Sequence, residues 1–371
     1  MKITRKINTI TTNPSNIPSL VWRRMTAQIS YRLCNLLSAH AFPPEAVNIY
    51  PTDRCNLKCL MCFERLRKPR VELDIVDWIN VIEQIKRFRP RIHISGGEPF
   101  VYSKIMDLVS HIRKNDLFLT ITTNGTFLSE YAKDIMRLKV NRIHISIDGS
   151  EDVHDTIRGV KGTFNRIMKG LEKIRKLAKY ARLPLIRINS MINFAQPTVM
   201  SEVIDIACHI DAHSIQFLHP MFANTQDIKS HRIFLKNYLH LNLNYWQNAD
   251  ISYKKPEDFK EAYNVVNNLK KERGILIDVF PSFNLKQLKA YYTGDENFYS
   301  IMHGACRAMW NTATIVPSGE VESCPDYILG NCTKVNFLNL WNNNIIKAPI
   351  FSRMPSLLLF LSVEIRYKED Y

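Results

Sequence analysis

Short β-branched runs alternate with amphipathic, helix-like stretches from about residue 46 onward. The expected strands are Val47–Tyr50, Arg91–Ser95, Phe118–Thr122, Arg142–Ile147, Leu185–Met191, Ser214–Leu218 and Ile275–Val279. The expected helices between them include Leu73–Phe88, Lys104–Lys114, Glu130–Leu138, Phe164–Tyr180 and Ser201–Ile210. Regular alternation favours parallel strands joined by right-handed crossovers. Because no dinucleotide-binding fingerprint follows the first strand, we predict an α/β fold, a partial (β/α)6 TIM-like barrel with its chemistry at the carboxyl ends of the strands.

We predict four parts along the chain. They are a basic leader with one amphipathic helix at 1–45, the partial barrel at 46–299, a small α+β module at 300–350 and an atypical tail at 351–371. The polar stretch from Met221 to Lys255 interrupts the alternation and is interpreted as an insertion or a substrate-side loop region. A further helix is expected at Asp258–Lys271.

The composition narrows the class of protein. No apolar run of the sequence approaches the roughly 20 residues needed to span a bilayer. The eight cysteines are irregularly spaced, which argues against a secreted disulfide framework and favours a cytoplasmic protein with metal-bound thiolates. Cys34 and Cys208 lie in apolar helix-like segments and are expected to be core cysteines. The net charge of +15 favours an acidic partner, but the basic residues are dispersed, so we do not expect nucleic acid.

A group of three cysteines, Cys55, Cys59 and Cys62, follows the first expected strand. Three thiolates on one loop can hold a metal centre but leave a four-ligand centre one ligand short. Taken alone, this spacing also fits a structural zinc site. The second expected strand ends in Ser95-Gly96-Gly97-Glu98-Pro99, a glycine-rich turn that would lie beside the cysteine loop at the same edge of the sheet.

The C-x3-C-x2-C spacing, the SGGEP turn and the alternating units together resemble the radical S-adenosylmethionine (radical SAM) superfamily over roughly residues 46–220. The resemblance implies that Cys55, Cys59 and Cys62 each bind one iron of a [4Fe–4S] cluster and that SAM chelates the fourth iron. It also implies an enzyme that cleaves SAM reductively to a 5′-deoxyadenosyl radical, which abstracts hydrogen from a substrate inside the barrel.

The resemblance implies SAM-binding roles for the turn after the second strand. Gly96 and Gly97 would let backbone groups approach closely, and Glu98 would accept hydrogen bonds from the amino group of SAM. Met61 stands where relatives carry an aromatic residue near the adenine, a space that methionine can fill.

Further candidate cofactor contacts lie at later strand ends. Asn124, Ser146 and Asp148 resemble residues that line the SAM pocket, although TNG and DG are also common turn sequences. Arg158 resembles an arginine that pairs with the SAM carboxylate; a surface position is the alternative. Asn189 alternates with apolar residues on its strand, so it is expected to face the barrel interior as a SAM or substrate contact, unless the strand edge exposes it.

The C-terminal module carries a second resemblance. Its sequence resembles the opening of the SPASM or twitch modules, which bind auxiliary iron–sulfur clusters. The residues that carry the resemblance are Cys306, then Gly319 followed by Cys324, then Leu329-Gly330-Asn331. Cys332 is a candidate third ligand, and no cysteine follows it. The module therefore supports at most one three-cysteine cluster with an open iron or a non-cysteine ligand. A structural zinc site or plain buried cysteines is the alternative.

These features predict a radical SAM oxidoreductase or transferase that acts on a small molecule, a sugar or a peptide. A peptide- or protein-modifying maturase of the same superfamily is the first alternative, and a non-catalytic metal protein that binds nucleic acid is the second. The expected partners are SAM, an unidentified substrate, and an acidic electron donor such as a flavodoxin or ferredoxin.

Overall fold

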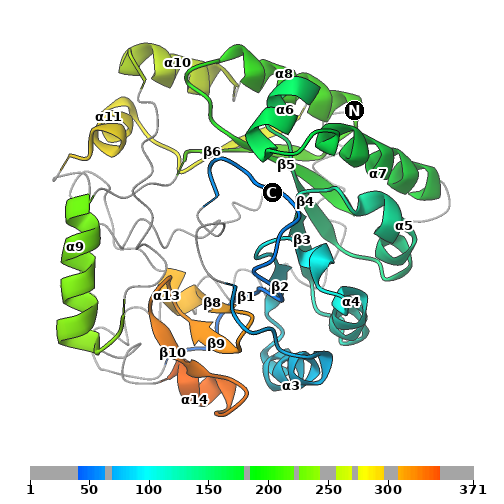
Figure 1. The fold of residues 1–371 in the computed structure, drawn as a ribbon, viewed down its shortest axis with the longest axis vertical. Coiled ribbons are helices and arrows are strands. Elements are labelled where there is room, and N and C mark those ends of the chain that lie inside the picture. The colour runs from blue at the N-terminus through cyan, green and yellow to red at the C-terminus, as the bar shows by residue number, and fades with distance from the viewer. Residues whose placement is uncertain are drawn as a thin grey trace.

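The computed structural model describes residues 41–62, 69–178, 184–220, 225–242, 256–269, 275–295 and 308–342 (Figure 1). A ten-stranded sheet runs through them in the order β10-β9-β8-β1-β2-β3-β4-β5-β6-β7. Its strands are β1 (Ala46–Ile49), β2 (Arg91–Ile94), β3 (Leu119–Thr123), β4 (Arg142–Ser146), β5 (Leu185–Met191), β6 (Ser214–Leu218), β7 (Leu276–Phe280), β8 (Thr312–Ile315), β9 (Glu320–Glu322) and β10 (Ile328–Asn331). Strands β1 to β7 pair in parallel, which confirms the predicted α/β partial barrel.

Helices follow most of the strands and cover the outer side of the sheet (Figure 1). The α-helices are α3 (Ile75–Ile85), α4 (Ile105–Lys114), α5 (Leu128–Arg137), α6 (Glu151–Arg158), α7 (Thr163–Leu177), α8 (Thr198–His209), α9 (Thr225–Phe234), α10 (Phe259–Leu269), α11 (Leu285–Thr293), α13 (Ala308–Asn311) and α14 (Phe337–Trp341). Helix α9 falls in the stretch that was expected to be irregular. The helix expected in the leader and the cysteines Cys34 and Cys306 lie outside the described residues. Cys208 is exposed on α8, so its predicted place in the core was wrong.

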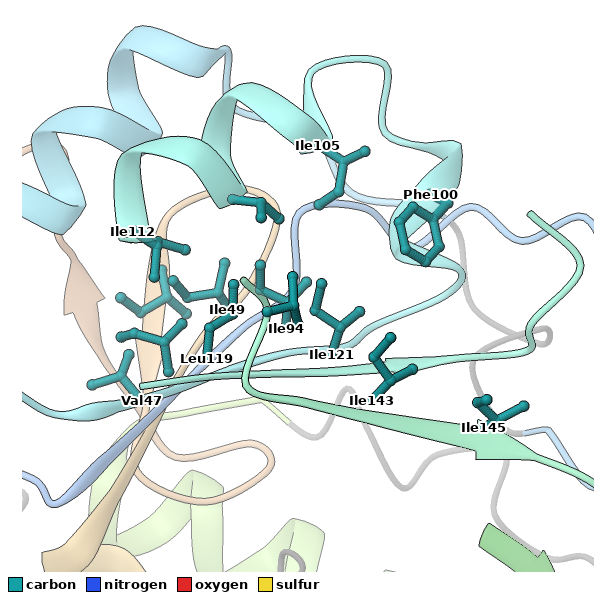
Figure 2. Close-up of a cluster of buried hydrophobic side chains, with 14 of the residues drawn as sticks. Val47, Ile49, Ile94, Phe100, Ile105, Ile112, Leu119, Ile121, Ile143 and Ile145 are labelled. Carbon is teal, nitrogen blue, oxygen red and sulfur yellow. The ribbon is translucent and has the colours of Figure 1, made fainter. Parts of the chain in front are cut away.

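The outer face of the sheet is apolar. Figure 2 shows side chains of β1 to β4 packed beneath helix α4, among them Val47, Ile94, Leu119, Ile143 and Ile145. These residues alternate along each strand with polar ones, as a period of two requires. Burial of one face against the helices therefore fixes which residues face the barrel interior.

The inner face of the barrel is polar. Asn48 Nδ2 donates to Thr314 Oγ1 at 3.2 Å, and Asn48 Oδ1 lies 3.2 Å from His93 Nδ1. His93 Nε2 lies 2.8 Å from Thr122 Oγ1, which is in turn 3.5 Å from His144 Nδ1. A hydrogen-bonded chain of side chains thus crosses neighbouring strands. The inner face is polar, unlike a barrel filled with aliphatic side chains, and it therefore suits a polar ligand.

The C-terminal strands belong to the same sheet as the barrel. Strand β8 pairs in parallel with β1, and β9 pairs antiparallel with β8 and β10. Trp341 Nε1 donates to the carbonyl oxygen of Phe42 at 2.8 Å, which ties α14 to the chain just before β1. The expected small module is therefore built onto the edge of the barrel. None of the described helices is both long and apolar enough to cross a membrane.

Candidate functional site

The cysteine loop leaves the carboxyl end of β1 and rests on the end of helix α6. The backbone N–H of Lys58 donates to the carbonyl oxygen of Arg158 at 3.1 Å, and that of Leu60 donates to Ile157 at 3.0 Å. Gly159 ends the helix with φ +70°, and a Cβ there would lie 2.7 Å from the carbonyl oxygen of Lys58. Glycine therefore permits both the left-handed cap and the close approach of the loop.

The three thiols of the loop differ in exposure and share a set of nearby polar groups. Cys55 is exposed, Cys59 is buried and Cys62 is partly buried. Asn124 Nδ2 lies 3.9 Å from Cys55 Sγ, and Arg158 Nη1 lies 3.7 Å from Cys59 Sγ. Although Cys55 is partly open to solvent, desolvation of its sulfur raises the pKa of the thiol to about 11, and the negative charges on Glu98, Cys59 and Cys62 raise it further. A bound cation is therefore needed to hold the Cys55 sulfur as a thiolate.

The SGGEP turn packs directly against the residues that lead into the cysteine loop. Gly97 N–H donates to the carbonyl oxygen of Thr52 at 3.0 Å, and Glu98 N–H donates to that of Arg54 at 2.9 Å. A Cβ on Gly97 would overlap the carbonyl oxygen of Arg54 and lie 2.6 Å from that of Asp53. The close approach expected at this glycine is thus made by the chain itself, and it positions Cys55.

Glu98 is fully buried, and its carboxylate joins the ends of β2 and β3. Oε1 accepts from Thr123 Oγ1 at 2.8 Å and from Phe100 N–H at 3.2 Å, while Oε2 accepts from Asn124 N–H at 2.7 Å. Burial raises the pKa of Glu98 to about 7, and these three hydrogen bonds oppose that rise. Because a carboxylate offers about four acceptor positions, protein donors already occupy most of the capacity that was predicted to serve SAM.

Asn124 connects the end of β3 to the cysteine loop. Its Nδ2 donates to Asn56 Oδ1 at 2.8 Å, and its Oδ1 accepts from the hydroxyl of Thr126 at 2.7 Å. Asn56 Nδ2 completes the network by donating to Thr126 Oγ1 at 2.9 Å. Asn56 and Thr126 were not identified from the sequence, where nothing distinguishes them from ordinary loop residues.

Arg158 and Asp148 form a buried ion pair beside Cys59. Arg158 Nη2 lies 2.6 Å from Asp148 Oδ2, and the side chains are 13% and 1% exposed. Asp148 Oδ1 also accepts from the backbone N–H of Met191 at 3.1 Å. Burial acts to lower the pKa of Arg158, but Asp148 and Cys59 outweigh it and raise that pKa, so the guanidinium stays charged next to the sulfur. The arginine expected to bind a SAM carboxylate is thus already paired within the protein.

The remaining predicted cofactor contacts occupy the same edge of the barrel. Met61 is half-buried in the turn between Cys59 and Cys62. Ser146 is half-buried at the end of β4 and pairs in register with Asn189 of β5. Asn189 is 6% exposed, which fits the predicted inward orientation.

Two ion pairs fix the residues just before Cys55, and neither was predicted from the sequence. Glu72 accepts from Arg54 Nε at 2.7 Å, and Arg70 Nη1 lies 3.0 Å from Asp53 Oδ1. Both pairs join residues 53–54 to residues 70–72, on the other side of the cysteines. They position the loop without touching a sulfur.

In the C-terminal part, Cys324 and Cys332 are both buried, and Cys306 lies outside the described residues. The Cys332 thiol donates to the carbonyl oxygen of Gly319 at 3.1 Å, and burial raises its pKa to about 12. This environment suits a protonated core thiol, so a ligand role for Cys332 remains a prediction only. Within the described ranges, no three His, Cys, Asp or Glu side chains are grouped to hold a single metal ion.

The donor set fits the predicted [4Fe–4S] cluster. Three cysteine sulfurs come from one loop, and N–H donors from Asn124 and Arg158 approach two of them. Hydrogen bonds of this kind stabilise the negative charge of sulfur ligands. The polar inner face of the barrel then lies next to the loop, where SAM would bind.

Comparison with known proteins agrees with this geometry. Residues 49–190 match the sequence model of the radical SAM superfamily, and residues 306–358 match that of the SPASM iron–sulfur cluster-binding domain. An Fe-coproporphyrin III synthase from Methanosarcina barkeri is 31% identical over 34% of this chain and 32% of its own length. The chain spans less than half the length of the curated relatives that it matches here. The share is 32% for this synthase, 37% for a tungsten-containing aldehyde ferredoxin oxidoreductase cofactor-modifying protein from Pyrococcus furiosus, and 42% for a GTP 3′,8-cyclase from Desulforamulus reducens.

Other similarities extend over most of the chain. A PqqA peptide cyclase from Gluconobacter oxydans is 24% identical over 81% of this chain and 77% of its own length. The crystal structure of Streptococcus suis SuiB bound to S-adenosylmethionine has a TM-score of 0.63 at 18% identity, and covers 85% of this chain and 72% of SuiB. The domain matches therefore identify a radical SAM domain, which contains the cysteine loop and the SGGEP turn, followed by a C-terminal SPASM domain.

Proposed function

We propose that this protein is a radical SAM enzyme that modifies a peptide side chain. The observation that carries the proposal is the assembly around the cysteine loop. The SGGEP turn, Asn124 and Arg158 come from different strand and helix ends, and all three contact the loop. A structural zinc site would have no need of that convergence, because its own ligands hold the metal.

Within this proposal, Cys55, Cys59 and Cys62 hold a [4Fe–4S] cluster whose fourth iron binds SAM. The bound cofactors supply one-electron cleavage of SAM and a carbon radical that abstracts hydrogen. Glu98 fixes the turn against β3, and the Arg158–Asp148 pair holds a positive charge beside Cys59. The surrounding wall of the barrel excludes water, which protects a reactive species from quenching.

A peptide substrate is favoured by the extent of the similarity. A relative that matches along most of the chain is a peptide cyclase, whereas the GTP 3′,8-cyclase of Desulforamulus reducens matches 35% of this chain. SuiB, which shares the fold, has been crystallised with its precursor peptide. The single auxiliary cluster proposed for the SPASM domain would accept the second electron that oxidation of a side chain releases.

An acidic electron donor in a cytoplasmic setting is part of the proposal. Arg54, Lys58 and Leu60 are exposed on or beside the cysteine loop, and the chain carries a net charge of +15. Reduction by flavodoxin is expected to slow as salt screens the attraction between the two surfaces. A rate that does not change with ionic strength would contradict this docking surface.

The activity itself is tested with anaerobically reconstituted protein, SAM and dithionite, by measuring 5′-deoxyadenosine. The wild-type protein is expected to form it, while Cys59→Ala is expected to form none and to lose the iron–sulfur absorption near roughly 400 nm. Cys208→Ala is the matched control, because Cys208 is exposed on α8 away from the loop, and it should behave as wild type. A colourless zinc-loaded protein without product would overturn the proposal.

A further inference from the structure

A row of polar side chains on the inner face of the barrel continues past the predicted cofactor contacts Ser146 and Asn189. Asn189 of β5 pairs in register with Gln216 of β6, and Gln216 pairs with Asp278 of β7. Neighbouring strands are about 4.8 Å apart, and residues in register point to the same side of a sheet. These three side chains therefore stand next to one another, and Ser146 of β4 begins the same row on the cofactor side.

Gln216 has a defined orientation in this row. It is fully buried, and its Nε2 donates to Asp278 Oδ2 at 3.3 Å. Only the NH2 end of an amide can face a carboxylate, so the amide assignment is fixed. Oε1 of Gln216 is then directed away from Asp278, and among the described residues it has no hydrogen-bond partner.

Asn189 presents a second acceptor of the same kind. Its Oδ1 is buried and also has no hydrogen-bond partner within the described part of the chain. A buried acceptor that has left water without gaining a donor is unfavourable, so each such group in a native protein requires an explanation, such as an ordered water or a bound ligand. Asn48 and His93 stand deeper in the barrel and differ from this row, because they are hydrogen-bonded through both of their polar ends.

The chemistry of the row selects its ligand. It offers two amide oxygens and one carboxylate as acceptors and the amide nitrogen of Asn189 as a donor, so a bound group must supply N–H or O–H donors to the oxygens. A phosphate or a carboxylate would approach the negative charge of Asp278 and would leave both amide oxygens without a donor. A side chain with an amide or hydroxyl group meets the requirement.

We propose that Asn189, Gln216 and Asp278 form the substrate subsite of this enzyme and bind the amide or hydroxyl side chain of a peptide. The inference rests on the proposed function, since it assigns the subsite to that enzyme's substrate. It places the substrate on the β6–β7 side of the Arg158–Asp148 pair, with Asn189 between the cofactor side and the substrate side.

The first test needs no ligand. Gln216→Met keeps the side-chain volume and removes the unpaired oxygen, but it also removes the 3.3 Å hydrogen bond to Asp278. The two effects oppose each other, so the melting temperature is expected to change little. Asn48→Leu is the matched control on the same inner face, and it should lower the melting temperature because it leaves partners of Asn48 unpaired. If Gln216→Met were as destabilising as Asn48→Leu, Gln216 would have a structural role and the proposal would fail.

The second test uses defined probes, the N-acetyl amides of serine, asparagine and norleucine, in saturation-transfer NMR with cluster-loaded protein and SAM. Wild-type protein should bind the serine and asparagine probes about tenfold more tightly than the norleucine probe, and Gln216→Met should lose that preference. An unchanged preference in the variant overturns the subsite. A weakened affinity for SAM itself would assign the row to the cofactor instead. Absence of 5′-deoxyadenosine from wild-type protein would refute the proposed function separately, because probe binding does not depend on turnover.

Discussion

A methyl group added at Gly97 tests whether the SGGEP turn positions the cysteine loop. The new Cβ of Gly97→Ala would overlap the carbonyl oxygen of Arg54 and approach that of Asp53 to 2.6 Å. Both atoms belong to backbone that cannot rotate away, so the turn and the loop must separate. Overpacking of this kind costs about 1–3 kcal/mol. If that cost falls on the arrangement that binds SAM, the affinity for SAM decreases by a factor of about 5 to 150.

The control for this prediction is Gly170→Ala, which creates a similar clash between two helices outside the cysteine loop. A Cβ on Gly170 would lie 2.5 Å from Leu128 Cβ, where helix α7 packs on α5. Both variants should lose thermal stability, but only Gly97→Ala should lose SAM affinity. The assay is SAM binding by anaerobic equilibrium dialysis, with iron content measured on the same samples. Equal SAM affinity in the two variants would refute the positioning role of the turn.

Three further predictions follow from the same contacts. Glu98→Ala should lower the free energy of unfolding by about 2–5 kcal/mol, because it leaves three buried donors unpaired. The same variant should bind SAM more weakly at unchanged iron content. Unchanged SAM affinity would contradict the place assigned to Glu98 in the site. Arg158→Met should cost about 3–5 kcal/mol of stability by leaving Asp148 buried and unpaired. Adding Asp148→Asn should recover part of that loss in urea denaturation, and strict additivity would argue against the pair. Burial lowers the pKa of His93 from 6.5 to about 3, so the unfolded chain binds a proton between those values that the folded one does not. The free energy of unfolding should therefore fall as pH drops below about 6.5, by up to roughly 5 kcal/mol from this group. In urea titrations at several pH values, His93→Phe should flatten this dependence on pH. The same pH dependence in the variant and the wild type would contradict the prediction.

The fold could be predicted from the sequence because the alternation of apolar and polar residues that defines each strand is visible in short segments. Each strand of the barrel alternates apolar residues, which pack under the helices, with polar ones that face the interior, and that period is visible along the chain. Helix α9 was missed because its polar composition resembles a loop and its apolar face is weak. Cys208 was misplaced because a cysteine between apolar residues on a helix can still lie on the exposed face.

The candidate site was accessible only as a set of residue types. The cysteines and the SGGEP turn are recognisable by spacing, but their partners are distant in the chain. Nothing in the local sequence shows that the carboxylate of Glu98 accepts hydrogen bonds from Thr123 and Asn124. The row of Gln216 and Asp278 was also invisible, because it depends on the register between strands that are joined by long connections.

The central claim is that the cluster on the cysteine loop keeps one iron open for SAM. Electron paramagnetic resonance of the reduced, reconstituted protein tests this claim directly when SAM carrying 15N in its amino group is added. We expect SAM to shift the cluster signal and the labelled nitrogen to couple to it. A signal that SAM leaves unchanged, in protein with full iron content, would show that the fourth iron is closed and would contradict the account.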